Sequence, residues 1–359
     1  MSDAVLADLQ ARIRAAVAAK SPLVVRGGGT KDFYGQSIAG EVLDTTPYAG
    51  IIDYDATELV ITARAGTRVA DIESAMRASG QMLACEAPHF GAAATLGGVV
   101  AAGLSGPRRP FGGAVRDIVL GVRMLDGTGE DLVFGGRVMK NVAGFDLPRV
   151  MAGALGTLGV LTEVSLKCVP VPKAEATRVL ECSVDDAIRM TNEWGGKPLP
   201  VSATCHCAGL LAVRLSGAAP AVEAAAKKIG GTAMANDSAF WESVREQTHR
   251  YFDPAKDTGV PLWRLSVKST AVHADLGGEQ LIEWGGALRW LVADGSATTE
   301  TIRKWAQANG GHATLFRARD KAAGAFHPLP ETLRMLHRRL KATFDPAGIL
   351  NRARLYPDF

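Results

Sequence analysis

The sequence predicts a protein of the α+β class that is built from two domains. Short β-type stretches separated by turns dominate the first half, which contains few long helices. Prolines and a lysine at 170–173 follow the last of these strands and give the best domain boundary. Beyond this boundary the expected order is β-α-β-β-α, which is typical of a ferredoxin-like sandwich. The length of 359 residues also suits about two domains.

The first domain is expected to open with an amphipathic helix. Apolar residues recur there at three- and four-residue spacing, namely Leu6, Leu9, Ile13 and Val17. Strands are then predicted at 23–26, 41–45, 50–54 and 59–65, and helices at 69–79 and 96–103. A strand pair at 118–125 and 131–134 encloses an Asp-Gly turn. A last strand runs out of the glycine turn at 156 and through 164.

The second half is expected to combine strands with amphipathic helices. The predicted helices cover residues 184–194, 221–228, 239–251 and 299–309. A basic amphipathic helix at 330–344 follows, and residues 345–351 form a turn into a short tail.

The composition excludes several classes of protein. The net charge of +3 is too small to indicate nucleic acid or a membrane surface as a partner, and no stretch is apolar enough to span a membrane. The five cysteines are odd in number and scattered, which suits a reducing compartment, so the default location is cytoplasmic. Cys205-His206-Cys207 lies in an alternating segment without a second ligand pair, and we expect no metal site there.

Two glycine-rich junctions are the most informative motifs. Residues 24–31 read Val-Val-Arg-Gly-Gly-Gly-Thr-Lys, and Thr95-Leu96-Gly97-Gly98 continues through Gly103, Ser105 and Gly106. Backbone N–H groups without side chains can converge on an anion, and glycine reaches the positive φ that such nests require. Two such sites suit a diphosphate, so the pattern points to a dinucleotide.

Other interpretations of these glycines fit less well. A nicotinamide-type fold would show G-x-G-x-x-G opening a helix, whereas Lys31-Asp32-Phe33-Tyr34-Gly35 has no helical period. A phosphate-binding P-loop would have Gly-Lys-Thr, and Gly29-Thr30-Lys31 inverts that order. A tight turn that binds nothing remains an alternative for the first cluster alone.

Several segments in the same order resemble the FAD-binding domain (PCMH-type) of the vanillyl-alcohol-oxidase superfamily. They are residues 26–31, 94–98, 103–113 with Arg116-Asp117, and 156–162. Residues 344–351 resemble the end of the flavin-linked oxidases of that superfamily. Residues 31–35, 105–110 and 140–146 resemble, more closely, the family of smaller flavin subunits of bacterial glycolate oxidase, also called glycolate dehydrogenase. The likeness covers nearly the whole chain.

The resemblance implies an architecture and a cofactor. Residues 1–172 would form a two-subdomain FAD-binding domain, 173–325 a ferredoxin-like α+β cap domain, and 326–359 a helix and tail returning to the FAD domain. Members of the superfamily that attach FAD covalently use a His in the first glycine loop. Thr30 stands at that position, so FAD would be bound non-covalently.

The resemblance also implies which residues hold FAD. Arg26, Gly27, Gly28, Gly29, Thr30 and Lys31 would wrap the diphosphate. The other expected contacts are Pro88, Thr95, Leu96, Gly97, Gly98, Gly103, Ser105, Gly106, Arg109, Gly159, Val160 and Thr162. One of Arg109, Arg116 and Lys140 could stabilise the reduced flavin.

Oxidation of a 2-hydroxy acid requires a base and a cationic clamp. His89 is the best single candidate for a catalytic residue, and packing beside the cofactor is its alternative role. The His-rich H-x-G-D-G-N-x-H motif of catalytic relatives is missing from this sequence.

This favours an FAD-binding subunit of a complex that oxidises glycolate to glyoxylate. Its partners would be a larger catalytic flavin subunit and an iron–sulfur subunit that receives the electrons, and the complex could lie at the inner face of the membrane. The alternatives are a self-sufficient oxidoreductase for D-lactate-like 2-hydroxy acids and a binding scaffold that has lost flavin.

Overall fold

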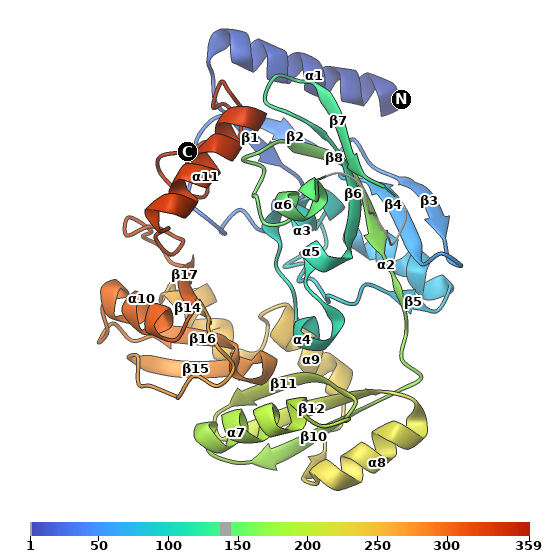
Figure 1. Cartoon of the computed structure of the whole chain (residues 1–359), viewed down its shortest axis with the longest axis vertical. Helices are drawn as coiled ribbons and strands as arrows, with labels where there is room; N and C mark the ends of the chain where they lie inside the picture. The colour runs from blue at the N-terminus through green and yellow to red at the C-terminus, as the bar shows by residue number, and fades with distance from the viewer. Residues whose placement is uncertain (1, 137–144) are drawn as a thin grey trace. The chain divides into compact units, whose positions relative to one another are not determined.

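The computed structural model describes residues 2–136 and 145–359, so Lys140 and most of the 140–146 motif lie outside the described residues. The chain divides into two compact units (Figure 1). Unit 1 contains Met1–Leu104, Ala114–Val171 and Pro328–Phe359. Unit 2 contains Ser105–Gly113 and Pro172–His327. None of the helices described is both long enough and apolar enough to traverse a bilayer.

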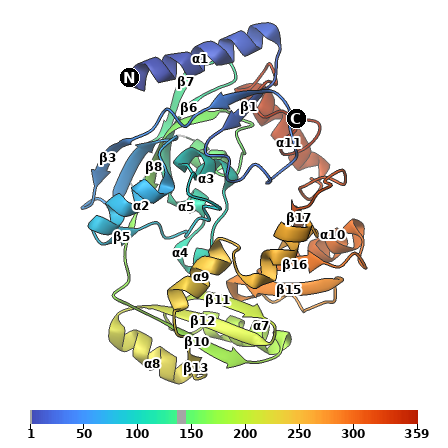
Figure 2. The same cartoon turned by 180° about the vertical axis from the view of Figure 1, so that it is seen from behind.

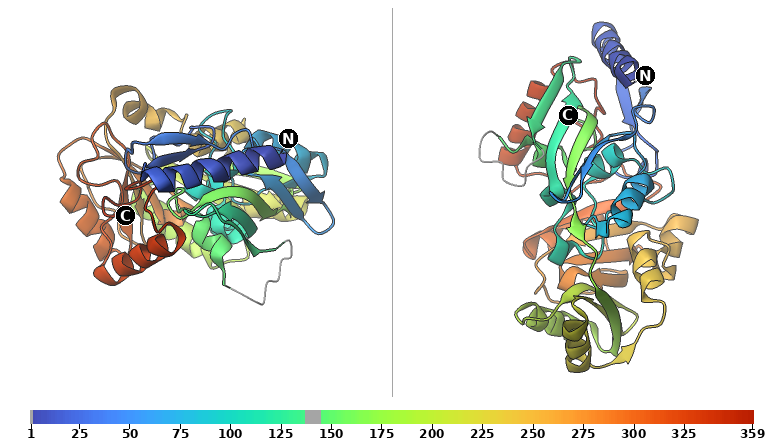
Figure 3. Two further views of the ribbon diagram at one scale, coloured as in Figure 1. Left: turned by 90° about the horizontal axis from the view of Figure 1, so that it is seen from above. Right: turned by 90° about the vertical axis from the view of Figure 1, so that its right-hand side faces the viewer.

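A small parallel strand pair with a covering helix begins unit 1. β1 (Leu23–Arg26) pairs with β2 (Glu41–Asp44), from Leu23 opposite Glu41 to Arg26 opposite Asp44. α1 (Ser2–Ala19) buries Leu9 and Ile13 in one core with Leu23 and Leu43, as its apolar spacing predicted. α1 lies across one end of the unit's larger sheet (Figure 3).

The larger sheet of unit 1 is antiparallel and has five strands. Their spatial order is β3 (Ile51–Asp55), β4 (Val60–Arg64), β8 (Val160–Lys167), β6 (Val119–Leu125) and β7 (Asp131–Gly135). The helices that share its core are α2 (Val69–Ala78), α3 (Leu96–Ala102), α5 (Val115–Ile118), α6 (Leu147–Met151) and the end of α11 (Glu331–Phe344). β5 (Gln81–Met82) and β9 (Val169–Pro170) form a separate short pair.

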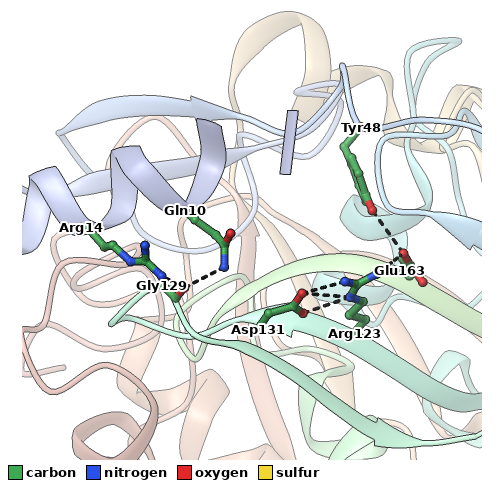
Figure 4. A network of polar contacts seen from close by, with 7 residues as sticks. All are labelled: Gln10, Arg14, Tyr48, Arg123, Gly129, Asp131 and Glu163. Carbon is green, nitrogen blue, oxygen red and sulfur yellow. Dashed lines mark hydrogen bonds and ion pairs between the residues drawn. The ribbon is translucent and has the colours of Figure 1, made fainter. Parts of the chain in front are cut away.

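A polar network ties strands of this sheet together (Figure 4). Arg123 on β6 donates to both carboxylate oxygens of Asp131 on β7, and its Nη1 lies 2.9 Å from Glu163 on β8. The hydroxyl of Tyr48 donates to the same Glu163 over 3.1 Å. Gln10 of α1 donates to the Gly129 carbonyl in the turn between β6 and β7. The network therefore joins α1, three strands and the loop after β2.

The C-terminal segment of unit 1 returns to β1 (Figures 1 and 2). α11 (Glu331–Phe344) is followed by a turn, and Leu350 bridges Leu23 in parallel. Lys341 Nζ donates to the carbonyls of Thr157 and Leu350 and to the buried Asp345 carboxylate, at 2.8, 2.6 and 2.6 Å. The return of the tail thus rests on a buried ion pair as well as on backbone pairing.

Unit 2 contains one eight-stranded antiparallel sheet that consists of two ferredoxin-like halves. The first half, shown in Figure 2, has the order β13-β10-β12-β11. It is formed by β10 (Ala174–Glu181), α7 (Val184–Gly195), β11 (Val201–Cys207), β12 (Leu210–Gly217), α8 (Ala219–Ile229) and β13 (Thr232–Ala233). In chain order these strands are numbers one to four, so the half has the 4-1-3-2 order of the βαββαβ motif.

The second half has the same strand order, read from the other edge of the sheet. Its elements are β14 (Leu262–Ser266), β15 (Gly278–Glu283), β16 (Leu288–Ala293), α10 (Thr299–Ala308) and β17 (His312–Arg317), and from that edge the strands follow as β17-β14-β16-β15. Residues 267–277 replace the first helix of the motif. β11 joins the halves by pairing with β15, through Cys205 opposite Glu283. The sequence predicted one such sandwich, because the missing helix hides the second β-α-β-β pattern.

Short elements complete unit 2. They are α4 (Arg109–Gly112), α9 (Asp237–Arg245), the 3₁₀ helices η1 (Arg250–Phe252) and η3 (Trp284–Gly286), and the π-type turn η2 (Pro254–Thr258). The single helix predicted over 239–251 was wrong. Gln247 takes a left-handed φ of 55°, which ends α9 and starts a new turn.

The predicted α+β class is confirmed by this mixture of sheets and covering helices. The strands predicted at 23–26, 41–45, 50–54 and 59–65 and the helices predicted at 69–79 and 96–103 match elements of unit 1 to within a residue or two.

Candidate functional site

A cavity of about 570 Å³ lies in unit 1. Its walls come from the loop after β1, from residues 37–42, from the start of α3, from residues 151–161 and from the C-terminal tail. The glycine loop 27–31 therefore opens into a defined space.

The glycines of this loop are required by close packing behind it. A Cβ on Gly28 would lie 1.6 Å from the carbonyl oxygen of Ala93, and a Cβ on Gly27 would lie 2.3 Å from Thr95 Oγ1. Real Cβ atoms do not approach other heavy atoms so closely. The loop is therefore pressed against residues 93–95, which also brings the two glycine clusters of the sequence together.

The backbone amides of the loop are available to a ligand. In the described part of the chain, the N–H groups of Gly27, Gly28, Gly29 and Thr30 donate no hydrogen bond to protein, and all four residues line the cavity. Consecutive free amides form a concave anion-binding site. This cradle fits the diphosphate of a dinucleotide.

The side chains of the loop hold its conformation. Thr30 Oγ1 and Lys31 Nζ donate to the carbonyl of His89, at 2.7 and 3.1 Å. Arg26 Nη2 pairs with Asp32 Oδ2 at 2.7 Å, and this bond raises the pKa of Arg26. The ammonium group of Lys31 is thus bound to a backbone carbonyl of the protein.

The second glycine cluster forms an adjoining part of the wall. Thr95 caps α3 by accepting a hydrogen bond from the Gly98 N–H at 3.3 Å, and Thr95, Gly97 and Gly98 line the cavity. Gly159 and Leu161 of the β8 segment line it as well. The hydroxyl of the neighbouring Thr162 is buried, and it has no hydrogen-bond partner among the described residues. Such a group gains from a ligand that supplies a partner.

The predicted contacts divide into three groups. The residues that line the cavity are Arg26, Gly27, Gly28, Gly29, Thr30, Lys31, Thr95, Gly97, Gly98 and Gly159. Those that belong to unit 1 but not to the lining are Pro88, Leu96, Gly103, Val160 and Thr162, and also the exposed Arg116. Ser105, Gly106 and Arg109 belong to unit 2, where Arg109 lies 4.5 Å from the Trp284 ring and the Trp284 indole donates to the Gly106 carbonyl.

His89 reaches the cavity loop through its carbonyl. Its ring Nε2 lies 3.2 Å from Glu73 Oε1 on α2, and the residue is not part of the cavity lining. Through its carbonyl, which accepts from Thr30 and Lys31, His89 supports the glycine loop. The role of its ring as a base stays a prediction.

Sequence reasoning missed one wall of the cavity. Leu155, Asn351 and Arg354 line it, although residues 155 and 351 are far apart in the chain. The sequence offered two signals, the resemblance of residues 344–351 to the end of the flavin-linked oxidases and the expected return of 326–359 to the FAD domain, but neither assigned Asn351 or Arg354 a contact with FAD.

Comparisons with known proteins show which family and fold this chain is similar to. Residues 5–135 match the FAD binding domain family. The glycolate oxidase subunit GlcE of Escherichia coli (strain K12) is 46% identical over 349 residues, which are 97% of this chain and 96% of that protein. The glycolate oxidase subunit GlcD of Bacillus subtilis (strain 168) is 32% identical over 158 residues, 44% of this chain and 33% of its own. A solved alkyldihydroxyacetonephosphate synthase shares the fold with a TM-score of 0.66 at 15% identity, over 96% of this chain and 73% of its own.

Proposed function

Because this chain belongs to the family of the glycolate oxidase subunit GlcE and carries an FAD-binding domain, we propose that it is the FAD-binding subunit of a glycolate-oxidising complex. The complex converts glycolate to glyoxylate, and the electrons leave through the flavin to an iron–sulfur partner. A larger flavin subunit of the same complex takes the 2-hydroxy acid.

The cavity residues have distinct tasks in this proposal. The amides of Gly27 to Thr30 bind the FAD diphosphate, and the start of α3 and residues 155–161 enclose the rest of the molecule. Thr30 donates its hydroxyl to the His89 carbonyl and offers no nucleophile at the position where some relatives carry a histidine, so FAD is held without a covalent bond. When bound, FAD supplies a two-electron acceptor.

The match over 96% of a protein named as a subunit carries the proposal. A second observation supports an electron-relay role. Asp32 is the carboxylate among the described lining residues, and Arg26 already binds it, so it is a poor base for a substrate hydroxyl.

Anaerobic reduction tests this function. Purified chain is loaded with FAD, mixed with glycolate or D-lactate, and followed by the visible flavin absorbance, alone and with the larger flavin and iron–sulfur subunits. We expect reduction only with the partners, and a colourless pellet after acid precipitation. Rapid reduction of the isolated chain would instead show a self-sufficient 2-hydroxy-acid oxidoreductase, and a chain that takes up no FAD would end the proposal.

A further inference from the structure

The C-terminal tail forms part of the cavity, and two of its side chains bind the segments that surround the ligand. We propose that Asn351 and Arg354 are positioning residues of the cofactor site, which hold the glycine loop and the wall segment at Leu155 in the conformation that accepts FAD. This inference rests on the assignment of the cavity to FAD.

Asn351 bridges two walls with a single amide. Its Oδ1 accepts a hydrogen bond from the Val25 N–H at 2.7 Å, one residue before the loop begins at Arg26. Its Nδ2 donates to the Leu155 carbonyl at 2.6 Å, and Leu155 belongs to another segment of the cavity wall. Asn351 is 5% exposed, so water does not compete with these bonds.

The two bonds require the chemistry of an asparagine. The Val25 N–H needs an acceptor and the Leu155 carbonyl needs a donor, and a carboxamide provides both within a few ångströms. Asn351 also takes a left-handed φ of 41°, a conformation that asparagine tolerates better than most residues. An aspartate of the same shape would keep the acceptor and place a carboxylate against the Leu155 carbonyl.

Arg354 fixes the other end of the loop. Its Nη1 donates to the Gln36 carbonyl at 2.9 Å, and its Nη2 donates to the carbonyls of Asp32 and Lys31 at 2.8 and 3.4 Å. The Gln36 N–H donates back to the Arg354 carbonyl at 2.9 Å. One planar guanidinium therefore defines the path of residues 31–36, just after the glycines.

These clamps lower the cost of ligand binding. Three consecutive glycines lose much conformational entropy when a ligand orders them. A loop that is already held at Val25 on one side and at residues 31–36 on the other pays most of this cost before FAD arrives, which strengthens binding.

Matched substitutions in the two units test the inference. Asn351→Asp and Arg354→Lys each remove specific donors and keep side-chain size. The controls are Asn192→Asp and Arg303→Lys in unit 2. Asn192 Nδ2 donates to the carbonyls of Ile188, Ser269 and Gly285, and Arg303 donates to those of Ala323, Gly324 and Phe326.

Two measurements on the full chain give the result. The first is the Kd for FAD from flavin fluorescence titration, and the second is amide hydrogen exchange of residues 26–36 without FAD. We expect Asn351→Asp and Arg354→Lys to raise the Kd at least about tenfold, which is about 1.4 kcal/mol, and to speed exchange in that segment. The controls lower the melting temperature and change neither quantity.

The opposite outcomes overturn the inference. If both variants fold and keep the wild-type Kd and the wild-type exchange rates, the tail does not position the cofactor site. Equal weakening of FAD binding by the controls would show general destabilisation instead. Should Asn351→Asp fail to fold, the milder Arg354→Lys decides alone. A wild-type chain that does not bind FAD would refute the proposed function, while the exchange data would still report on positioning.

Discussion

Gly28 shows how the site depends on the absence of a single atom. The backbone there passes the Ala93 carbonyl so closely that an added Cβ would lie 1.6 Å from the oxygen. A clash with backbone cannot be relieved by rotation of a side chain, so the loop or residues 93–95 must move. Either movement would misplace the amides that form the anion cradle.

We therefore expect Gly28→Ala to abolish measurable FAD binding and to destabilise unit 1 by about 1–3 kcal/mol. Gly195 at the end of α7 is the control, since a Cβ there meets nothing within 4 Å. Gly195→Ala should be neutral or slightly stabilising, because alanine favours the helix. Calorimetric FAD titration and urea denaturation measure both effects, and wild-type affinity in Gly28→Ala would contradict the cradle.

The site residues that belong to a recognisable local motif could be predicted from the sequence. The site residues that come from distant segments of the chain could not. Segments 27–31 and 95–98 could be recognised because each is rich in glycine. Asn351 is joined to Val25 across 326 positions, and an isolated Asn in a turn carries no sign of its partner. The side chains of Thr30 and Lys31 bind the His89 carbonyl, and nothing in the local sequence reveals that partner.

At the scale of elements, Arg123 connects neighbouring strands of unit 1 through two carboxylates. Its side chain is 34% exposed, so solvent weakens these ion pairs. The two parallel hydrogen bonds to Asp131 strengthen the interaction, so we expect it to contribute to stability. Loss of the guanidinium would leave Asp131 and Glu163 near each other without a counter-charge.

Arg123→Met should accordingly lower the free energy of unfolding by about 1–2 kcal/mol. Arg189→Met is the matched control, because Arg189 also pairs with two carboxylates, Asp186 and Glu193, on the exposed face of α7. It should leave the urea midpoint unchanged. Equal midpoints for both variants would show that the network in Figure 4 does not stabilise the sheet.

At the scale of the whole molecule, most of the histidines whose pKa is lowered by burial lie in unit 2. Burial lowers the pKa of His249, of His273 and of His327 below the ordinary 6.5, and nearby arginines lower each further. The Nδ1 atoms of His249 and His327 accept hydrogen bonds from the N–H groups of Tyr251 and Ala313. Protonation would remove these acceptors.

The direction of the pH effect follows from linkage. As the pH falls through 6.5 the unfolded chain takes up protons before the folded chain does, so the free energy of unfolding falls. The loss continues until the pH reaches the lowered folded pKa values. We expect a lower unfolding midpoint for unit 2 at pH 5.5 than at pH 7.5, followed by tryptophan fluorescence in urea. His249→Asn keeps an acceptor for the Tyr251 N–H but has no titrating ring, so it should reduce the difference between the two midpoints. An unchanged difference would show that His249 does not contribute to the pH dependence.

The pairing of the tail with β1 has a consequence for biosynthesis. The loop that begins at Arg26 emerges from the ribosome early, while Asn351 and Arg354 are translated more than three hundred codons later. A nascent polypeptide can form α1 and the glycine turn long before it can close the pocket. If the tail holds the cofactor site as proposed, we expect flavin capture to follow translation, and a message truncated before codon 351 to yield an apoprotein even when unit 2 is complete.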